Sequence, residues 1–328
     1  MFEILDGGLM ATVQDLGRHR YFSIALVKSG AMDTLSLRIG NLLVGNELGE
    51  AGLESSVGLR LRALRTTVIA ITGGDLSPKI NDAEAPMWEA IRIERGDILS
   101  FGSIRSGFRA YLSVAGGIDV PVLFGSKSTY VSGRRGDSGF GGFEGRLLRK
   151  GDVVKAGRPR APIDSIILRR VKPSVIPRFG DTWEIRVVLG SFEHFLAERG
   201  LETFLTHPWR VSYRAGRTGY WYDGPLLEFK KRDDQQMRGA GTHPSNYISD
   251  GVPVGGIQAP FGIPVIFWVD QSTIGAHLKI ATVISPDMDK VGQSKPGDKT
   301  FFKHVTVSEA QESFRSTQEL FKEESIFA

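Results

Sequence analysis

Residues 90–101 have the sequence Ala-Ile-Arg-Ile-Glu-Arg-Gly-Asp-Ile-Leu-Ser-Phe, in which a Gly-Asp pair separates two short apolar runs. Glycine takes the left-handed turn conformation at little cost, and an aspartate carboxylate can accept a hydrogen bond from nearby backbone. The pair therefore predicts a tight turn that leads into a strand. The same pattern recurs at Gly151-Asp152, Gly180-Asp181 and Gly297-Asp298. Because it occurs in both halves of the chain, we expect two related β-domains.

Other short runs rich in β-branched residues lie between Gly, Asp and Pro residues, which is typical of β-strands. Closing many short strands into barrels removes exposed strand edges. We therefore expect a mainly β fold with two β-barrel domains and a few short helices. The predicted strands are Thr67–Thr72, Ala90–Ile93, Ile98–Phe101, Arg109–Val114, Ser165–Val171, Ile185–Leu189 and Pro264–Val269.

Signals for helices are few. Asp33 can cap a helix whose apolar residues form one stripe. Ser285-Pro286 is typical of an N-cap followed by proline in the first helical position, and Ser308 with Gln311 resembles a capping box that opens a C-terminal helix. Ser191–Gly200 is a further short helical segment.

The stretch Arg158-Pro159-Arg160-Ala161-Pro162 is typical of a linker, because its two prolines cannot donate a hydrogen bond to a strand ladder. We therefore predict an N-terminal β-barrel domain over residues 1–160 and a C-terminal β-barrel domain over residues 161–328.

Composition excludes several classes of function. The chain has 328 residues, and its 41 basic and 37 acidic residues give a net charge of +4 without a dense basic block, so nucleic-acid binding is not expected. It has no cysteine, which excludes disulfides, thiolate nucleophiles and cysteine-ligated zinc. The N-terminus lacks a signal-peptide pattern and no apolar window is long enough to span a bilayer. We expect a cytoplasmic protein with no membrane partner and no metal site.

Several catalytic motifs are missing from the sequence. The stretch Phe124–Thr129 only partly resembles a phosphate-binding loop, since its lysine is displaced and the first glycine is lacking. No Met-Lys-Met biotin-attachment sequence occurs, so any biotin would arrive on another chain. His243 and Ser245 would share a face if they lay in a strand, but a catalytic triad also needs an acid and an oxyanion hole that the sequence does not reveal.

Motif-like stretches follow one another along nearly the whole chain: Thr12–Arg18, Ser29–Asp33, Asn41–Asn46, Ile71–Asp75, Arg109–Thr129, Gly141–Arg146, Arg217–Tyr220, Ser249–Pro260, and Thr273, Gly275 and Lys279–Ile284. As an ordered set they resemble the biotin-dependent carboxyltransferase, or allophanate hydrolase subunit 2, family, which includes KipA and the C-subunit of 5-oxoprolinase. The resemblance implies two cyclophilin-like β-barrel domains. It also implies a partner, a KipI-like protein (the B-subunit of 5-oxoprolinase or allophanate hydrolase subunit 1).

The resemblance implies three alternative functions. The leading one is a subunit of a 5-oxoprolinase-like complex that uses ATP to open 5-oxoproline to glutamate. The second is the carboxyltransferase component of a urea or amide carboxylase, which would use carboxybiotin from a carrier protein. The third is a non-catalytic regulator of the KipA type that antagonises a KipI-like kinase inhibitor. All three would act on, or bind through, a cleft built with a partner chain.

Residues that suit ATP-driven amide chemistry gather between positions 246 and 279. A lactam or urea is unreactive, so its enzyme must position reactants and stabilise charge on oxygen with fixed amide, hydroxyl and cationic donors. We expect Lys279, which can hold a carboxylate or phosphate, to be catalytic together with Thr273 and Gln258. The expected substrate-binding residues are Asn246, Asp270, Gly275, Arg217, Gln14, Asp15 and Arg18.

The chain departs from the family pattern at two motifs. Where the family has Asp-Arg-Gln-Thr-Thr-Gly-Gly-Tyr-Pro-Lys, residues 270–279 have Gln271 in place of the arginine and Ser272 in place of the glutamine. The acid that precedes the Arg-x-Gly-Tyr motif is Gly216 here. Losing a cation and a carboxylate changes what the site can bind, so the exact substrate is left open.

Overall fold

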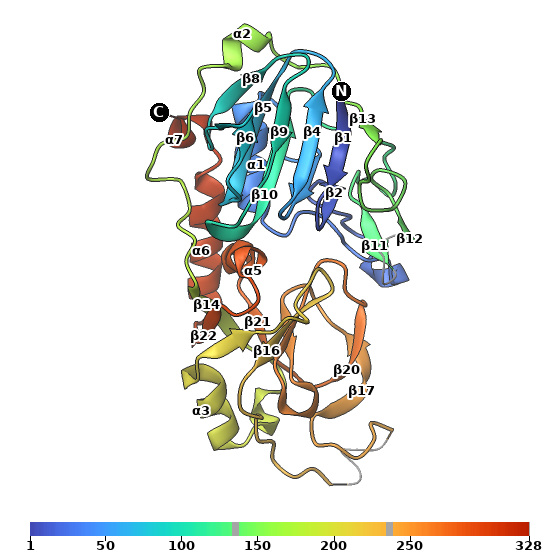
Figure 1. Cartoon of the computed structure of the whole chain (residues 1–328). Coiled ribbons are helices and arrows are strands. Elements are labelled where there is room, and N and C mark those ends of the chain that lie inside the picture. The colour runs from blue at the N-terminus through green and yellow to red at the C-terminus, as the bar shows by residue number, and fades with distance from the viewer. Residues whose placement is uncertain (133–137, 234–238, 328) are drawn as a thin grey trace. The chain divides into compact units, whose positions relative to one another are not determined.

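The computed structural model describes residues 1–132, 138–233 and 239–327, and it is mainly β with a few short helices, as predicted. The chain divides into two compact units (Figure 1). The first unit contains Met1–Arg20, Lys28–Phe179 and Gln318–Ala328, and the second contains Tyr21–Val27 and Gly180–Thr317.

The first unit is built from two main sheets. One has the strand order β13-β1-β4-β9-β6-β7 and the other the order β2-β3-β10-β5-β8, while β11 pairs with β12 in a separate hairpin. The bounds are β1 Phe2–Gly7, β2 Ala11–Gln14, β3 Gly52–Ser55, β4 Leu59–Ala63, β5 Thr67–Asp75, β6 Lys79–Ile80, β7 Ala83–Glu84, β8 Ala90–Ile93, β9 Ile98–Ser100, β10 Ser106–Val114, β11 Tyr130–Ser132, β12 Ser138–Phe140 and β13 Val153–Val154.

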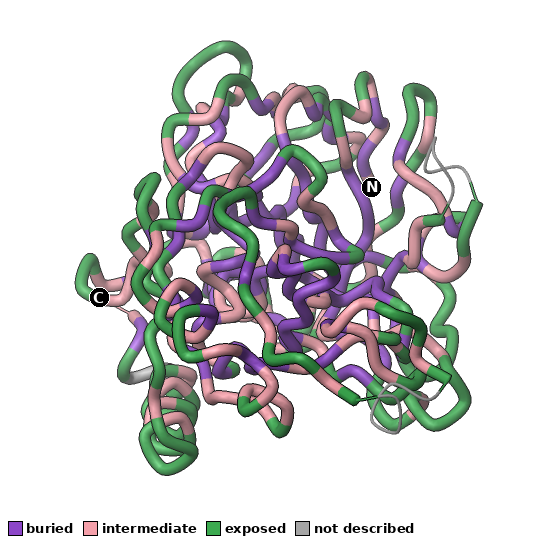
Figure 2. Tube along the Cα trace, turned by 90° about the horizontal axis from the view of Figure 1, so that it is seen from below, coloured by how far each residue is buried: buried purple, intermediate pink, exposed green. Residues whose placement is uncertain are grey.

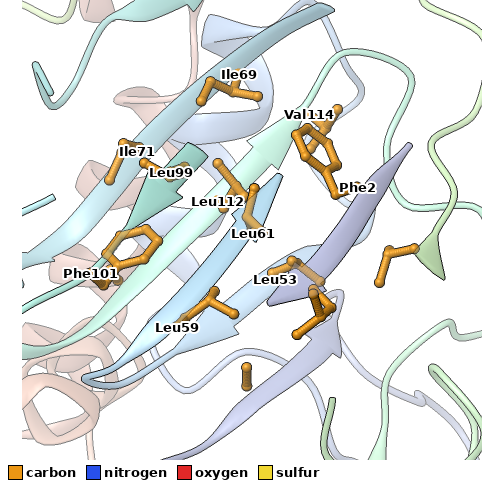
Figure 3. Packing of buried hydrophobic residues seen from close by; sticks show 14 of the residues in the cluster. Phe2, Leu53, Leu59, Leu61, Ile69, Ile71, Leu99, Phe101, Leu112 and Val114 are labelled. Carbon is orange, nitrogen blue, oxygen red and sulfur yellow. The ribbon is translucent and has the colours of Figure 1, made fainter. Parts of the chain in front are cut away.

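Alternation along the strands places one apolar face of each sheet inside this unit. In β4, for example, Leu59, Leu61 and Ala63 are buried, and the arginines between them are exposed. Figure 3 shows side chains of both sheets pointing toward one another, among them Leu61 from one sheet and Leu112 from the other. Burying these side chains is the main source of stability for the unit.

The second unit contains a closed barrel with the strand order β14-β21-β18-β19-β16-β15-β22, in which β22 closes the ring by pairing in parallel with β14. A separate hairpin joins β17 to β20. The bounds are β14 Thr182–Leu189, β15 Trp209–Val211, β16 Gly219–Asp223, β17 Asn246–Gly251, β18 Gly256–Gln258, β19 Val265–Phe267, β20 Ile274–His277, β21 Lys279–Val283 and β22 Lys299–His304.

Aromatic side chains are buried among these strands. The ring of Phe302 stacks on Phe204 at 4.7 Å between centroids, and Tyr222 meets it edge-on at 5.3 Å. The ring of Tyr220 lies 5.5 Å from that of Trp268.

In Figure 2 the buried stretches (purple) lie mostly inside the trace and the exposed ones (green) mostly at its outer turns.

The helices in the residues that the structure describes are short. They are η1 Phe22–Ile24, α1 Thr34–Leu43, α2 Ile163–Ile166, η2 Glu193–Phe195, α3 Glu198–Thr206, η3 Pro260–Gly262, η4 Ser285–Asp287, α5 Met288–Gln293, α6 Val307–Glu319 and α7 Glu323–Ile326. Asp33 caps α1 as predicted, since its carboxylate accepts a hydrogen bond from the backbone N–H of Ser36 at 2.9 Å. None of the helices in the described parts of the chain is both long and apolar enough to cross a membrane.

The predicted Gly-Asp turns form at three of the four positions. Gly96, Gly151 and Gly297 adopt positive φ, and the aspartate that follows each accepts a hydrogen bond from the backbone N–H three residues earlier, at 2.7 to 3.0 Å. Gly180 does not have a positive φ. The same local device therefore serves both units, because it depends only on a short stretch of sequence.

One predicted strand and the cap of one predicted helix were wrong. The predicted strand Ser165–Val171 begins inside α2, because Ile166 packs into a buried cluster beside α1 and Val171 forms only an isolated bridge. The C-terminal helix α6 is capped two residues earlier than predicted. There Thr306 accepts a bond from the N–H of Glu309, whose carboxylate accepts one from the N–H of Thr306.

The structure also differs from the sequence-based expectation in two other respects: the position of the boundary between the two units, and the arrangement of the strands in the first unit. Residues 161–179 lie in the first unit, where Ile166 and Val171 are buried, so the chain leaves that unit after Phe179 rather than near residue 160. The predicted closed barrel is found in the second unit. The strands of the first unit form two sheets, one of which is bounded by the two-residue strands β13 and β7, too short to extend the ladder.

Candidate functional site

Strand register in the second unit brings several predicted site residues together. Gln258 of β18 lies opposite Lys279 of β21, and Asn246 of β17 lies opposite His277 of β20. The side-chain Nε2 of Gln258 donates a hydrogen bond to the backbone carbonyl of His277 at 2.9 Å, which joins the two pairs. The segment from residue 246 to residue 279 therefore forms one local cluster.

Lys279 is the cation of this cluster. Its Nζ donates a short hydrogen bond to the carboxylate of Asp250 and another to the carbonyl of Gly251 at 3.0 Å, and it lies 5.6 Å from the ring centre of Phe192. The Lys279 side chain is 19% exposed and that of Asp250 is 51% exposed, so the ammonium group is held in place while its carboxylate partner stays in contact with solvent.

Asp250 was not predicted from the sequence. The hydrogen bond from Lys279 and that from the N–H of Gly251 hold the pKa of the Asp250 carboxyl below its usual range, so it is ionised at neutral pH. It lies 29 residues before Lys279 in the chain, and only the pairing of β17 with β20 brings the two together. Asp250 lies in the motif-like stretch Ser249–Pro260, but nothing in that stretch identifies it as the partner of Lys279.

Gln258 offers a buried acceptor. It is 1% exposed, and its Oε1 has no hydrogen-bond partner among the residues that the structure describes. A Cβ atom at Gly275 would lie 2.7 and 2.8 Å from the two amide heteroatoms of Gln258, so a larger residue there would require this buried amide to shift. Leaving a buried acceptor unpaired costs about 1–3 kcal/mol, and a ligand N–H would remove that cost if the residues that cover Oε1 moved aside.

Arg217 and Asp270 form a buried ion pair. Arg217 Nε lies 2.7 Å from Asp270 Oδ2, and the side chains are 5% and 1% exposed. The neighbouring Thr273, also buried, accepts a hydrogen bond on its carbonyl from the N–H of Val252 at 3.0 Å. These three predicted residues thus hold the chain at the start of β20, and the charged groups of the pair already satisfy each other.

A histidine cluster lies beside the predicted residues. Ser245 Oγ is 2.7 Å from His243 Nδ1, a bond formed in a turn rather than along a strand. Because the N–H of Ser245 also donates to Nδ1, that nitrogen is the acceptor and Nε2 carries the proton of the neutral ring. Ser245 is fully buried, which argues against a role as a nucleophile. Burial, and then the neighbouring His243, lower the pKa of His277.

The N-terminal site residues Gln14, Asp15 and Arg18 lie in the first unit and converge on one loop, residues 126–129. Asp15 accepts hydrogen bonds from the hydroxyls of Ser126 and Ser128 and from the N–H of Lys127. Arg18 Nη2 donates to the carbonyl of Ser128 at 2.5 Å, and Gln14 Nε2 donates to the carbonyl at position 129 at 3.0 Å. All three hold the loop in place.

This loop does not suit a nucleotide phosphate. The Nζ of Lys127 is paired with a carboxylate oxygen of Glu50 at 2.5 Å, and the serine hydroxyls are engaged by Asp15. A phosphate-binding loop needs its lysine and its backbone N–H groups free for the ligand. Within the described residues, no group of three or more His, Asp or Glu side chains could hold a metal ion.

Comparisons with known proteins give several matches. Residues 24–304 match the family described as the carboxyltransferase domain, subdomain A and B. The chain is 33% identical over 322 residues to the urea amidolyase of Lachancea kluyveri, covering 95% of this chain and 17% of that protein. It is 31% identical over 325 residues to the C-subunit of 5-oxoprolinase from Escherichia coli, covering 98% of this chain and 97% of that protein.

A solved structure has the same fold. The crystal structure of Kluyveromyces lactis urea carboxylase matches with a TM-score of 0.90 and 33% identity, covering 98% of this chain and 29% of that one. The chain thus spans less than a third of the urea carboxylase and urea amidolyase chains that it matches.

Proposed function

This chain belongs to the family of the carboxyltransferase domain, subdomain A and B, and from that membership we propose that it is one subunit of an ATP-dependent amide-processing enzyme of the 5-oxoprolinase type. The observation that carries the proposal is the match to the 5-oxoprolinase C-subunit, which extends over 97% of that protein. Because that relative is named as a subunit, we propose that this chain also works in a complex, and that its companion is a KipI-like protein.

The proposed reaction opens a lactam by water. The bond between the carbonyl carbon and the nitrogen breaks, the oxygen of one water joins the carbon, and a proton goes to the nitrogen, while a second water converts ATP to ADP and phosphate and so supplies the driving force. In this scheme Lys279 binds the substrate carboxylate or the negative charge that develops on oxygen. Gln258 Oε1 accepts the lactam N–H, and Asp250 fixes the Lys279 ammonium. Since the described residues of this chain offer no fitting phosphate loop, we assign ATP to the companion protein.

A second candidate function is carboxyl transfer to urea or a related amide. It is favoured by the TM-score of 0.90 to the urea carboxylase and by the family description itself. The carboxyl group would come from carboxybiotin on another chain, since no biotin-attachment sequence occurs here. In that reaction an acceptor nitrogen forms a bond to the carboxyl carbon as the bond from that carbon to a biotin nitrogen breaks, and the proton of the acceptor nitrogen passes to the biotin nitrogen. Lys279 would then bind the carboxyl oxygens and Gln258 an acceptor N–H.

The two functions are separated by one reconstitution. The chain is co-purified with a KipI-like companion, and ATP hydrolysis is measured with 5-oxoproline, with urea, and without substrate. We expect hydrolysis that depends on 5-oxoproline and yields glutamate. Hydrolysis that depends on urea and requires a biotinylated carrier would favour the second function. A stable complex that hydrolyses no ATP with either substrate would overturn both.

A pair of variants tests the role of Lys279. Lys279→Met should lower turnover of the reconstituted complex by about a hundredfold or more, since one lost donor to a developing charge has an effect of that size. Lys303→Met is the matched control, because Lys303 also pairs with a carboxylate, Glu184 at 3.2 Å, but is 58% exposed. Equal turnover in both variants, with circular dichroism unchanged, would remove Lys279 from the mechanism.

A further inference from the structure

A cavity of about 530 Å³ lies within the first unit, and residues of β12 and β13 form part of its lining. Its volume falls in the range of small-molecule sites, about 300–1,000 Å³. The proposed function assigns no ligand to it. It is lined by Asp119, Val120, Pro121, Leu123, Gly139, Phe140, Gly141, Gly142, Phe143, Glu144, Gly145, Val153 and Lys155.

The walls of this cavity are mostly apolar. The ring of Phe140 packs against two neighbours. The guanidinium carbon of Arg18 lies 4.7 Å from its centre, and the centre of the Tyr130 ring lies 5.1 Å away. Leu123 and Val153 are 38% and 40% exposed, which is high for large apolar side chains and places them where a ligand would cover them. The cavity therefore suits an apolar group of limited size.

One wall is a turn with free backbone donors. The N–H of Gly145 donates to the carbonyl of Gly141 at 2.8 Å and closes the turn. Within the described residues, nothing accepts a hydrogen bond from the N–H groups of the three residues between them, Gly142, Phe143 and Glu144. Successive free N–H groups in such a turn are typical of sites that bind an anion or a terminal carboxylate.

The charged side chains at the cavity are of two kinds. The carboxylate of Glu144 forms an ion pair with Arg146 at 2.6 Å, and this pairing reduces its electrostatic repulsion of a bound anion. Neither the ammonium of Lys155 nor the carboxylate of Asp119 has a hydrogen-bond or ion-pair partner elsewhere in the described structure. The backbone N–H of Asp119 donates to the carbonyl of Lys155 at 2.9 Å, so the two residues are adjacent. The cavity lining thus offers one cation and one anion that are not paired with each other, which suits a ligand with both an acid and an N–H.

We propose that this cavity binds an N-acyl α-amino acid with an apolar side chain. The carboxylate is held by Lys155 and by the free N–H groups of the turn, and the amide N–H is accepted by Asp119. The apolar side chain packs between Phe140, Phe143 and Val153. Each part of the ligand thus meets a group that otherwise lacks a partner or is exposed. This site does not depend on the reaction proposed for the Gln258 and Lys279 cluster.

Isothermal titration calorimetry of the purified chain with N-acetyl-L-phenylalanine tests the proposal. The matched probe is N-acetyl-L-phenylalanine amide, which keeps the ring and the acyl N–H but lacks the negative charge. We expect the acid to bind at least about tenfold more tightly than the amide, since charge-assisted hydrogen bonds are the strong ones. N-acetylglycine, which lacks the apolar group, should bind more weakly than the phenylalanine compound.

Three variants test whether the ligand binds in this cavity. Lys155→Gln should weaken the acid about threefold to fivefold, because the lysine is exposed, and leave the amide unchanged. Val153→Trp should fill the cavity and abolish binding of both. Lys79→Gln, an exposed lysine of the same unit on β6, is the control and should change nothing.

The proposal is overturned if the acid gives no saturable heat, if acid and amide bind equally, or if Lys155→Gln leaves the preference for the acid intact. Circular dichroism of Val153→Trp checks its folding. Should that variant fail to fold, the Lys155→Gln comparison still decides, because Lys155 is exposed and its replacement by glutamine keeps most of the length of the stem.

Discussion

The buried ion pair between Arg217 and Asp270 allows a quantitative test of how the second unit is held together. Both side chains are almost fully buried, and they make contacts of 2.7 and 3.3 Å. Replacing Arg217 by methionine keeps most of the volume but leaves the carboxylate buried without its cation. Breaking such a pair costs about 3–5 kcal/mol, because the remaining charge has lost both water and its partner.

Urea denaturation followed by tryptophan fluorescence measures this loss. Four of the five tryptophans, at positions 183, 209, 221 and 268, lie in the second unit, so the signal reports mainly on that unit. With a slope of about 2 kcal/mol per molar urea, a loss of about 4 kcal/mol moves the midpoint by about 2 M. Lys303→Met, which breaks an exposed pair, should cost less than about 1 kcal/mol.

The double variant Arg217→Met with Asp270→Leu separates charge from packing. Because it removes both charges and keeps apolar volume, it should recover most of the stability lost in the single variant. The reasoning is refuted if Arg217→Met shifts the midpoint no more than Lys303→Met does. It is also refuted if the double variant is as unstable as the single one, since the loss would then come from packing alone.

Three further predictions concern stability. Thr306→Ala should cost about 1 kcal/mol in urea denaturation, because it removes the cap of α6. Gly275→Ala should cost about 1–3 kcal/mol in the same assay and lower turnover of the complex, because the new Cβ meets a buried amide. Burial raises the pKa of Asp287, but hydrogen bonds from Arg186 outweigh it and hold that pKa below the usual value of about 3.9. The stability due to Asp287 is therefore present above that value and lost as pH falls through the lowered pKa, so Asp287→Asn should destabilise at pH 7 but not at strongly acid pH.

Each of these predictions has a matched control. Ser308→Ala should be nearly neutral, since Thr306 and not Ser308 caps α6; the opposite order would support the sequence-based cap. Gly251→Ala lies on the partner strand β17, where a Cβ would meet nothing within 4 Å, so it should be tolerated. If it were as harmful as Gly275→Ala, the clash would not be the cause. For Asp287, a loss of stability that is the same at every pH would contradict the linkage.

Local features of the fold could be predicted because each depends on a few neighbouring residues. Three of the four Gly-Asp turns, the Asp33 cap and the strand Ala90–Ile93 formed where the sequence placed them. The error at Ser165–Val171 arose because the neighbouring residues alone did not decide between a strand and a helix. An apolar run without clear alternation suits either a strand or a helix, and packing of Ile166 against the buried cluster decided for the helix.

Sequence by itself determined the fold class and the family, and it predicts that the chemistry lies in the stretch between residues 246 and 279. Only the tertiary structure determined which side chains meet. Asp250 reaches Lys279 because β17 pairs with β20. Gln14, Asp15 and Arg18 are engaged in holding a loop more than 100 residues away in the chain. Partners distant in sequence are fixed by strand register and burial, which depend on the whole chain, whereas turns and caps are fixed by the few residues that form them.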